Sequence, residues 1–512
     1  MTDAATPPDR PVCHFTPPAG WMNDPNGLVH HAGQWHLHYQ HHPHSLVWGP
    51  MHWGQAVSRD LLTWEHLPIA LAPDEHGTIF SGSAVIDHDG VAGHGKGALV
   101  AFYTSHRERD RGQSLAVSLD AGRTWTKHPG NPVLLPPDGS ADFRDPQVVR
   151  YQHPAGPSWW VMVVAAGRVL RFYRSDDLLR WTPTGTYVLP AADHLGVVET
   201  PELFELPVDD TAERVWVLAV GQTAGGPQGG SGVRYLLGGF DGHRFTPSEG
   251  DTEVRWADHG ADFYAAQSWT DSPDGRRIWV GWMSNWAYAE RTPATTWRGM
   301  LSIPRELGLT RGGDGRLWLT QRPVRELTDA HVPLVDLHDP DLATAQQALA
   351  RIRGRCLDVT LAVEFAGTTD GRLDLAVHHA PGGATRVGYD PASGQVVVDR
   401  SRSGGGLDPA APTHHRSPPL TGRGAVELRV LVDTTSVEVF ADGGAVVLSV
   451  LAFPPPGATG IRLELDDARI IRLAVAAVTA SAGGGSGPGC GRSHGDQSAG
   501  PSRRRSGRSA PR

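Results

Sequence analysis

Three acidic residues, Asp24, Asp145 and Glu199, lie in segments that differ from ordinary surface turns. Asp24 belongs to the run Trp-Met-Asn-Asp-Pro-Asn-Gly at 21–27, and Asp145 belongs to Phe-Arg-Asp-Pro at 143–146. A proline follows each aspartate, and the one after Asp24 favours extended backbone at that aspartate. Paired carboxylates in one concave site are the usual equipment for cleaving glycosidic bonds, because one attacks or activates water and the other donates a proton. Each acid taken alone could instead be a turn residue.

The neighbours of these acids favour different roles. Asp24, with Trp21 and Met22 before it, is the candidate nucleophile. Glu199 is the candidate acid/base, because its apolar neighbours favour the neutral acid. Glu202 is its rival, but in a strand the two glutamates point to opposite faces, so only one can serve. Asp145 follows Arg144, which favours an ionised carboxylate suited to binding sugar hydroxyls.

Aromatic residues near these segments could form a wall on which a sugar ring stacks, although core packing is the alternative for each. The candidates are Trp48, Trp53, Phe80, Trp282 and Trp286. Residues 30–44 contain many histidines, which could in principle bind a metal ion. His36 and His38 alternate with other residues as in a β-strand, so we favour a strand over a metal site here. The chain has no His-Glu-x-x-His pattern and no phosphate-binding glycine loop. We therefore expect no metal and no cofactor.

An internal repeat predicts the fold that positions the acids. The pattern Ser-x-Asp, followed a few residues later by Trp, recurs with its aspartate at Asp60, Asp120 and Asp177. A degenerate fourth copy contains Asp241. The spacings are 60, 57 and 64 residues, and a weak fifth copy contains Asp314. Such units suit four-stranded sheets, and about five of them arranged radially form a β-propeller. The repeat aspartates are then expected in hairpin turns.

The repeat also gives each acid a position within its unit. The three acids precede the turn aspartates of their units by 36, 32 and 42 residues. Ser81 has the same position in the second unit, and Asp262 and Tyr264 have it more loosely in the fifth. The strand at this position would be the innermost one. Innermost strands converge on the propeller axis, so we expect the three acids to face one funnel.

The length of 512 residues favours two domains, and the strand patterns make the chain all-β. Valine and leucine alternate in the later part, which predicts a β-sandwich. We also expect one short helix at 342–352. The expected divisions are a polar N-terminal segment (1–10), a five-bladed β-propeller catalytic domain (11–325), a linker (326–334), a β-sandwich (335–478) and a disordered Gly/Ser/Arg-rich tail (479–512).

Composition limits the partners and the compartment. The net charge is −9, and because residues 481–512 carry +5, the rest carries −14, which disfavours nucleic-acid binding. No apolar run of about 18 residues predicts a membrane span. The three distant cysteines predict neither a disulfide framework nor a zinc site. No signal peptide is visible, so cytoplasmic residence is the default expectation and secretion the alternative if a leader is missing. The oligomeric state is left open.

These motifs together resemble glycoside hydrolase family 32, which includes invertases, inulinases and levanases. The resemblance covers roughly residues 11–478. It rests on the segments 21–27, 51–54, 80–83, 143–146, 199–204, 262–265 and 281–286, with 399–401 and 436–440 in the sandwich. Among family members, levanases and exo-inulinases look most similar.

The resemblance implies a five-bladed β-propeller followed by a C-terminal β-sandwich. It implies retaining hydrolysis of β-fructofuranosidic bonds in levan, inulin or sucrose, through a covalent fructosyl-enzyme intermediate. Asp24 would be the nucleophile, Glu199 the acid/base and Asp145 the transition-state stabiliser. The partner would be a fructose-containing oligo- or polysaccharide. The implied substrate-binding residues are Asn23, Gln40, Trp48, Phe80, Ser81, Arg144, Asp262, Tyr264 and Trp286.

Two departures from the family pattern are visible. Val198 and Thr200 stand where the family usually has Trp and Cys beside the acid/base, which could alter the pKa of the proton donor. His42 stands where Asn is common, which affects the expected pocket rim. The alternatives are an inverting arabinanase or xylosidase type of propeller enzyme, a non-catalytic carbohydrate-binding protein, and a fructosyl transferase. A carboxylate separation of about 5–5.5 Å would indicate retention, and about 6.5–9.5 Å inversion.

Overall fold

The computed structural model describes residues 10–107, 110–137, 139, 142–190, 196–248, 253–367, 371–420 and 424–479. The expected polar N-terminal segment and the expected tail therefore lie outside the described residues, apart from Arg10 and Thr479. Strands dominate the described chain, and the predicted all-β class is confirmed. In this part of the chain no helix is long and apolar enough to cross a membrane.

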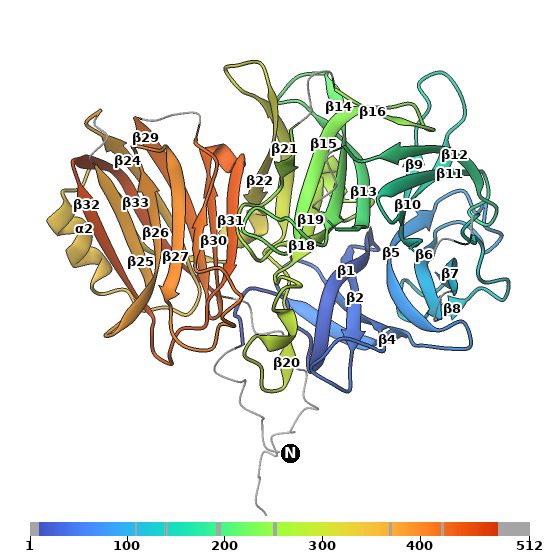
Figure 1. Ribbon diagram of the computed structural model, residues 1–512, viewed down its shortest axis with the longest axis horizontal. Coiled ribbons are helices and arrows are strands. Elements are labelled where there is room, and N and C mark those ends of the chain that lie inside the picture. The colour runs from blue at the N-terminus through green and yellow to red at the C-terminus, as the bar shows by residue number, and fades with distance from the viewer. Residues whose placement is uncertain are drawn as a thin grey trace, which may run out of the picture. The chain divides into compact units, whose positions relative to one another are not determined.

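The first part of the chain forms five antiparallel sheets that follow one another in sequence (Figure 1). Their strands are β1 (Gly20–His31), β2 (Gln34–His42), β3 (His52–Ser58) and β4 (Trp64–Leu71); β5 (Thr78–Asp87), β6 (Ala98–Arg107), β7 (Asp110–Ser118) and β8 (Thr126–Lys127); β9 (Arg144–Tyr151), β10 (Trp159–Ala166), β11 (Val169–Ser175) and β12 (Thr182–Val188); β13 (Val198–Pro207), β14 (Arg214–Gln222), β15 (Gly232–Phe240) and β16 (Phe245–Pro247), with β17 (Arg255–Trp256) beside β15; and β18 (Tyr264–Ser268), β19 (Ile278–Trp282), β21 (Arg305–Arg311) and β22 (Leu317–Pro323).

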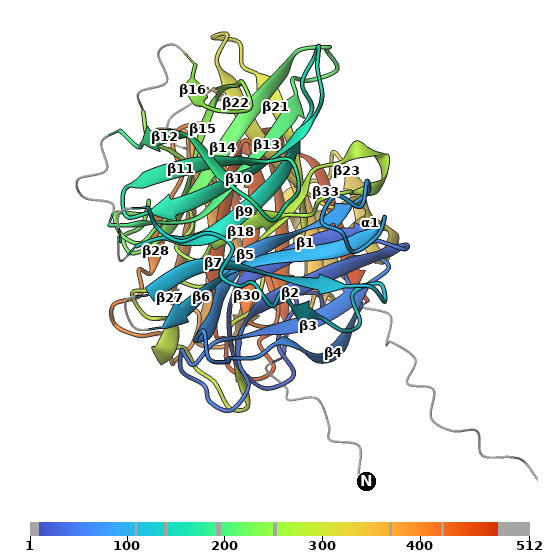
Figure 2. The same ribbon diagram turned by 90° about the vertical axis from the view of Figure 1, so that its right-hand side faces the viewer.

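These sheets close into a five-bladed propeller. The first strand of each sheet contacts the first strand of the next, in the order β1, β5, β9, β13 and β18, and β18 contacts β1 again. Figure 2 labels β1, β5, β9 and β18 near the centre of the view. In addition, β20 (Trp297–Arg298) pairs in parallel with the start of β1, which adds a late segment to the first blade. The first strand of each blade is therefore the innermost one, as the repeat predicts.

The repeat aspartates are turn residues between the third and fourth strands of their blades. Asp60 accepts hydrogen bonds from the backbone N–H groups of Leu62 and Thr63. Asp177 and Asp241 accept the equivalent bonds from the residues two and three positions ahead of them. A side chain that satisfies two backbone donors fixes a tight turn, which explains why the aspartate recurs.

The second part of the chain is a β-sandwich of two antiparallel sheets, drawn mainly in orange and red in Figure 1. One sheet has the order β23 (His331–His338), β33 (Ala468–Val478), β24 (Leu357–Phe365), β29 (Ala425–Asp433), β30 (Ser436–Ala441) and β31 (Val446–Leu451). The other has the order β28 (His414–Arg416), β27 (Gln395–Arg402), β26 (Gly383–Asp390), β25 (Arg372–Ala380) and β32 (Gly460–Asp466).

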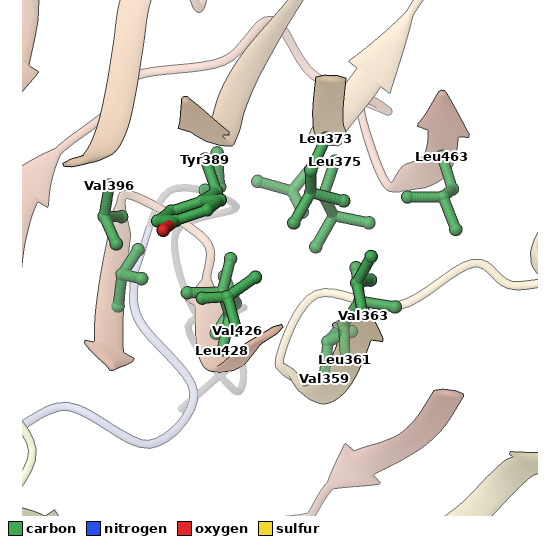
Figure 3. Packing of buried hydrophobic residues seen from close by; sticks show 14 of the residues in the cluster. Val359, Leu361, Val363, Leu373, Leu375, Tyr389, Val396, Val426, Leu428 and Leu463 are labelled. Carbon is green, nitrogen blue, oxygen red and sulfur yellow. The ribbon is translucent and has the colours of Figure 1, made fainter. Parts of the chain in front are cut away.

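The sandwich core comes from alternating side chains of both sheets, such as Leu361, Leu375 and Leu428 (Figure 3). Burial of this apolar surface drives the two sheets together. The expected helix is present as α2 (Leu342–Leu349), which Asp341 caps by accepting a hydrogen bond from the Thr344 N–H.

The expected linker at 326–334 contains regular secondary structure. It holds most of α1 (Arg325–Asp329) and the start of β23, which pairs with β33 at the edge of the sandwich. Residues of β23 are mostly half-buried or exposed, so its sequence lacks the apolar alternation of a core strand.

Candidate active site

A bulge interrupts each innermost strand at the height where the candidate site residues lie. The registers shift between Met22 and Pro25 in β1, between Ile79 and Gly82 in β5, opposite Val163–Ala165 in β9, between Glu199 and Glu202 in β13, and between Tyr264 and Gln267 in β18. A bulge leaves one residue unpaired and redirects its side chain. Asp145, Thr200 and Ala265 have positive φ angles of 61°, 44° and 50° at these bulges. Five matching bulges therefore redirect polar side chains towards a common axis.

The structure brings Asp24, Asp145 and Glu199 together in one open cavity of about 500 Å³. These acids come from the separate strands β1, β9 and β13. The remaining lining residues are Asn23, Gln40, Trp48, Phe80, Ser81, His106, Arg111, Arg144, Trp286, Glu290 and Arg291. Seven of the nine expected substrate-binding residues are in this set, and Asp262 and Tyr264 are not.

Asp24 is held by two hydrogen bonds. The Ser81 hydroxyl donates to Oδ2 at 2.6 Å, and the Asn23 amide donates to Oδ1 at 2.9 Å. The Trp21 indole N–H in turn donates to the Asn23 carbonyl oxygen at 2.8 Å, which fixes the direction of the amide. Burial raises the pKa of Asp24 to about 6, with a smaller contribution from the charge of Glu199, although the two hydrogen bonds oppose the rise. A carboxylate held in one orientation with its pKa just below neutrality is suited to attack as an anion.

Asp145 has a higher pKa than its neighbour Arg144 leads one to expect. Burial is the main cause and the charge of Glu199 the second, and together they raise the pKa of Asp145 to about 7 despite Arg144. Burial and Glu199 therefore oppose the ionised form of Asp145 that its sequence neighbour Arg144 favours. The Arg144 guanidinium instead donates to Glu199 Oε1 at 2.6 Å. Asp145 Oδ2 accepts a hydrogen bond from the Thr200 N–H at 2.9 Å, which joins β9 to β13.

The sequence neighbours of Glu199 predict apolar surroundings, but the side chains that contact its carboxylate are polar. Arg144 from β9 bonds to one of its oxygens, and the Tyr264 hydroxyl from β18 donates to the other at 2.9 Å. Glu199 is thus oriented by residues of both adjacent blades. Glu202 lies away from the cavity, where the backbone N–H and hydroxyl of Ser268 donate to it. Of the two glutamates, Glu199 alone lines the cavity.

The expected aromatic wall is only partly present. Trp48, Phe80 and Trp286 line the cavity, and Trp48 is 42% exposed at the rim. Trp53 and Trp282 are fully buried. The Trp53 indole donates to the Phe80 backbone oxygen, and the Trp282 ring packs against Trp286 with centroids 4.8 Å apart. These two tryptophans support the wall from behind and do not face a sugar.

Asp262, expected to bind substrate, lies outside the residues that line the cavity. It is completely buried and pairs with Arg400 of the sandwich at 2.7 Å, while the Tyr288 hydroxyl donates to it at 2.6 Å. Asp262 therefore joins the propeller to the sandwich. Tyr264 is also buried, and it contributes through its hydrogen bond to Glu199 rather than by direct exposure to the cavity.

Four cavity residues have no counterpart among the sequence expectations: His106, Arg111, Glu290 and Arg291. The His106 ring stacks on Phe80 with centroids 4.4 Å apart, and Arg111 donates to His106. Glu290 accepts from the Trp48 backbone N–H at 3.1 Å. Arg291 pairs with Asp408 of the sandwich at 2.5 Å. No periodic pattern in the sequence around Glu290 indicates that this segment reaches the cavity.

The two departures in sequence have separate surroundings. Val198 packs in the apolar cluster between the third and fourth blades, and Thr200 supplies the N–H bonded to Asp145. His42 is buried outside the lining set, and its Nδ1 lies 2.9 Å from the Val47 backbone oxygen. His42 thus contacts the loop that carries Trp48 and does not line the cavity.

Comparison with known proteins agrees with this geometry. The model of the glycosyl hydrolases family 32 N-terminal domain matches residues 14–323, and the model of the family 32 C-terminal domain matches residues 331–477. The chain is 44% identical over 463 residues to a levanase of Bacillus subtilis, covering 89% of this chain and 68% of that protein. It is 34% identical over 498 residues to an extracellular exo-inulinase of Aspergillus awamori, covering 89% and 91%.

Solved structures give the same result. A crystal structure of the exo-inulinase from Aspergillus awamori superposes with a TM-score of 0.83 at 32% identity, covering 92% of this chain and 99% of that one. The chain spans about half, 51%, of the length of a levanase from Bacillus sp. strain L7. These relatives do not favour the inverting alternative. The name of the exo-inulinase describes an extracellular protein. The default expectation of cytoplasmic residence is therefore wrong.

Proposed function

The chain belongs to family 32 of the glycosyl hydrolases, and we propose that it cleaves β-fructofuranosidic bonds in levan, inulin or sucrose with retention of configuration. The names of its relatives, levanase and extracellular exo-inulinase, support fructans as the substrate class and a secreted protein. We further infer that Asp24 is the nucleophile, Glu199 the acid/base and Asp145 the residue that binds fructosyl hydroxyls.

One observation carries this proposal. Three carboxyl groups from three innermost strands line one cavity, and only Asp24 has both oxygens held by neutral donors. Glu199 has a cation on one oxygen and a hydroxyl on the other. Two carboxyl groups in such different environments suit the two different roles of a retaining glycosidase.

The first half of the reaction forms a bond between Asp24 and the fructosyl anomeric carbon. The ionised Asp24 attacks that carbon while Glu199 gives its proton to the departing glycosidic oxygen. Asn23 and Ser81 keep the attacking carboxylate in a single orientation, which reduces the entropic cost of reaching the transition state.

The second half releases fructose. Glu199, now ionised, takes a proton from water as the water attacks the anomeric carbon, and Asp24 leaves as a carboxylate. The Arg144 guanidinium, 2.6 Å from Glu199, orients the carboxylate towards the water that it must deprotonate in this half of the reaction. Asp145, with a pKa near 7, can accept or donate a hydrogen bond to a fructosyl hydroxyl.

Product analysis on sucrose, inulin and levan in parallel tests the proposal. We expect the wild-type protein to release fructose, and the variants Asp24→Asn and Glu199→Gln to lose orders of magnitude in kcat while keeping the wild-type unfolding temperature. Glu202→Gln is a matched control, since Glu202 is a buried acid three residues away that does not line the cavity. No fructose from any of the three substrates would contradict the proposal and favour a carbohydrate-binding protein.

A further inference from the structure

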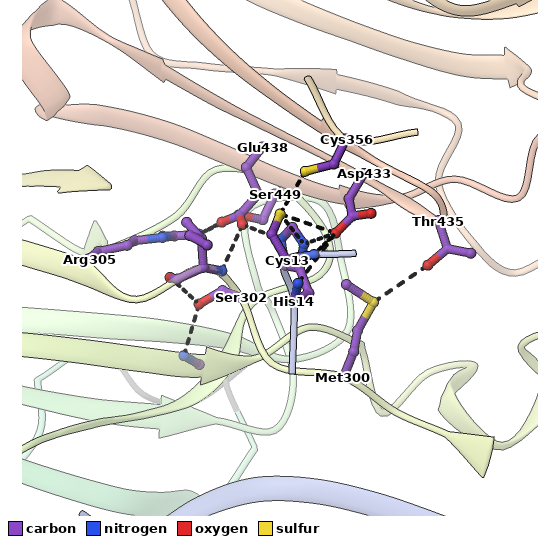
Figure 4. Close-up of polar contacts among 12 residues, drawn as sticks. Cys13, His14, Met300, Ser302, Arg305, Cys356, Asp433, Thr435, Glu438 and Ser449 are labelled. Carbon is purple, nitrogen blue, oxygen red and sulfur yellow. Dashed lines mark hydrogen bonds and ion pairs between the residues drawn. The ribbon is translucent and has the colours of Figure 1, made fainter. Parts of the chain in front are cut away.

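Two cysteines lie side by side in a buried polar cluster where the chain enters the first blade (Figure 4). The Sγ atoms of Cys13 and Cys356 are 2.8 Å apart, although 343 residues separate them in sequence. Both side chains are buried, with 2% and 3% exposure. Cys13 precedes β1 of the propeller, and Cys356 directly precedes β24 of the sandwich.

Backbone hydrogen bonds fix the positions of both cysteines independently of the thiols. The N–H groups of Val12 and Cys13 donate to the two oxygens of Asp433 at 2.8 and 2.9 Å. The Val478 N–H donates to the Cys356 carbonyl oxygen at 3.1 Å. The sandwich strands β29 and β33 therefore hold the two residues in place, and the short distance between the sulfurs follows from the fold.

A metal ion is the first alternative for such a cluster, because Cys13, His14 and Asp433 present possible ligand atoms close together. The nitrogens of His14 are already bonded to Asp433 and Glu438, each at 2.8 Å. Two thiolates on one tetrahedral zinc ion are separated by about 3.8 Å, given Zn–S bonds of about 2.3 Å. Sulfurs at 2.8 Å leave no room for a shared ion, so a bond between the sulfurs fits the geometry better.

We propose that Cys13 and Cys356 form a disulfide that joins the residues preceding β1 to the sandwich. A disulfide bond brings the sulfurs to about 2.05 Å, so they must approach by roughly 0.8 Å. The oxidant is an external disulfide. One cysteine thiolate attacks it and releases one oxidant thiol; the second thiolate then attacks the mixed disulfide and releases the other. Two cysteine protons and two electrons thus leave the protein, and the secretion proposed above supplies a compartment in which the bond persists.

The bond would close a loop that contains the entire propeller. Cross-links over long loops stabilise a protein mainly by restricting the unfolded chain. Burial raises the pKa of the Cys356 thiol to about 11, and it also raises the pKa of Cys13. Thiolates are thus scarce and inaccessible in the folded protein. The bond is therefore expected to form during folding and to resist reductant until the protein unfolds.

Counting thiols tests the proposal without any reference to enzyme activity. The chain has three cysteines, and the third, Cys490, lies outside the described residues. Protein exported to an oxidising compartment and unfolded without reductant is expected to show one reactive thiol, and three after reduction in denaturant. A digest without reductant should contain the Cys13 peptide linked to the Cys356 peptide. Three thiols before reduction, or zinc bound in stoichiometric amount, would overturn the proposal.

Variants separate the bond from its surroundings. The variant C13S/C356S is expected to unfold several degrees lower than the oxidised wild type and to keep its kcat, since neither cysteine lines the cavity. Cys490→Ser is the matched control and should retain the wild-type unfolding temperature. Wild-type protein that is unfolded, reduced and refolded should have the same unfolding temperature as the double variant. Equal unfolding temperatures for the oxidised wild type and the double variant would count against a stabilising bond.

Discussion

The hydrogen bond from Ser81 to Asp24 gives a quantitative test of the proposed nucleophile. The bond is 2.6 Å long and lowers the pKa of Asp24, which burial raises to about 6. A hydrogen bond to a charged group contributes about 1.5–3 kcal/mol, and about 1.4 kcal/mol corresponds to one pKa unit. Because the bond favours the anion, the variant Ser81→Ala should raise the pKa of Asp24 to between about 7 and 8.

The expected result is a pH-dependent loss of activity. If Asp24 must be ionised to react, the reactive fraction at pH 6 falls from about one half to about one tenth or less, so kcat/KM falls by about five- to fifty-fold. The ratio of mutant to wild-type kcat/KM should then rise with pH as Asp24 ionises in both proteins. The measurement is kcat/KM for sucrose or inulin across the pH range, taken as this ratio at each pH.

Ser83→Ala is the control for this experiment. Ser83 lies on the same strand and is equally buried, but its hydroxyl donates to the Pro146 backbone oxygen rather than to Asp24. The ratio of kcat/KM for Ser83→Ala to kcat/KM for the wild type should be independent of pH. A flat ratio for Ser81→Ala as well would refute the assignment of the acid limb to Asp24.

Two further predictions concern the contact between propeller and sandwich. Arg400→Met leaves the Asp262 carboxylate buried without its cation and should lower the free energy of unfolding by about 3–5 kcal/mol in denaturant titrations; Arg469→Met, at an exposed arginine, should have a much smaller effect, and equal effects would contradict this prediction. Although burial opposes it, the cation of Arg305 holds the pKa of Glu438 at about 2. Since the folded-state pKa is depressed, this stabilisation is present above about pH 4.5 and is lost as the pH falls towards 2; an unfolding temperature that stays constant from pH 5 to 3 would contradict it.

Much of the fold follows from periodicity in the sequence. The spacing of Asp60, Asp120 and Asp177 predicts the blades, because in each unit the aspartate accepts a hydrogen bond from the serine two residues before it and fixes a turn. The same spacing placed Asp24, Asp145 and Glu199 on innermost strands. Local patterns suffice here because blades are successive meanders whose strands pair with sequence neighbours.

The features that the sequence does not predict depend on contacts between distant segments. The pKa of Asp145 is set by burial and by Glu199 on the next blade, whereas its sequence neighbour Arg144 bonds elsewhere. Asp262 occupied its expected position only loosely, and its partner Arg400 comes from the sandwich. The rim residue Glu290 reaches the cavity through a loop, for which the sequence contains no periodic signal.

Trapping the covalent intermediate tests the central claim most directly. The variant Glu199→Gln, supplied with an aryl β-fructofuranoside whose leaving group needs no proton, should form the fructosyl-enzyme but hydrolyse it slowly, because the base for the second half is absent. Rapid acid quench and peptide mass mapping should then find one added fructosyl residue on the peptide that contains Asp24. No adduct despite a burst of phenol release, or an adduct on a peptide that lacks Asp24, would contradict the assignment of Asp24 as the nucleophile.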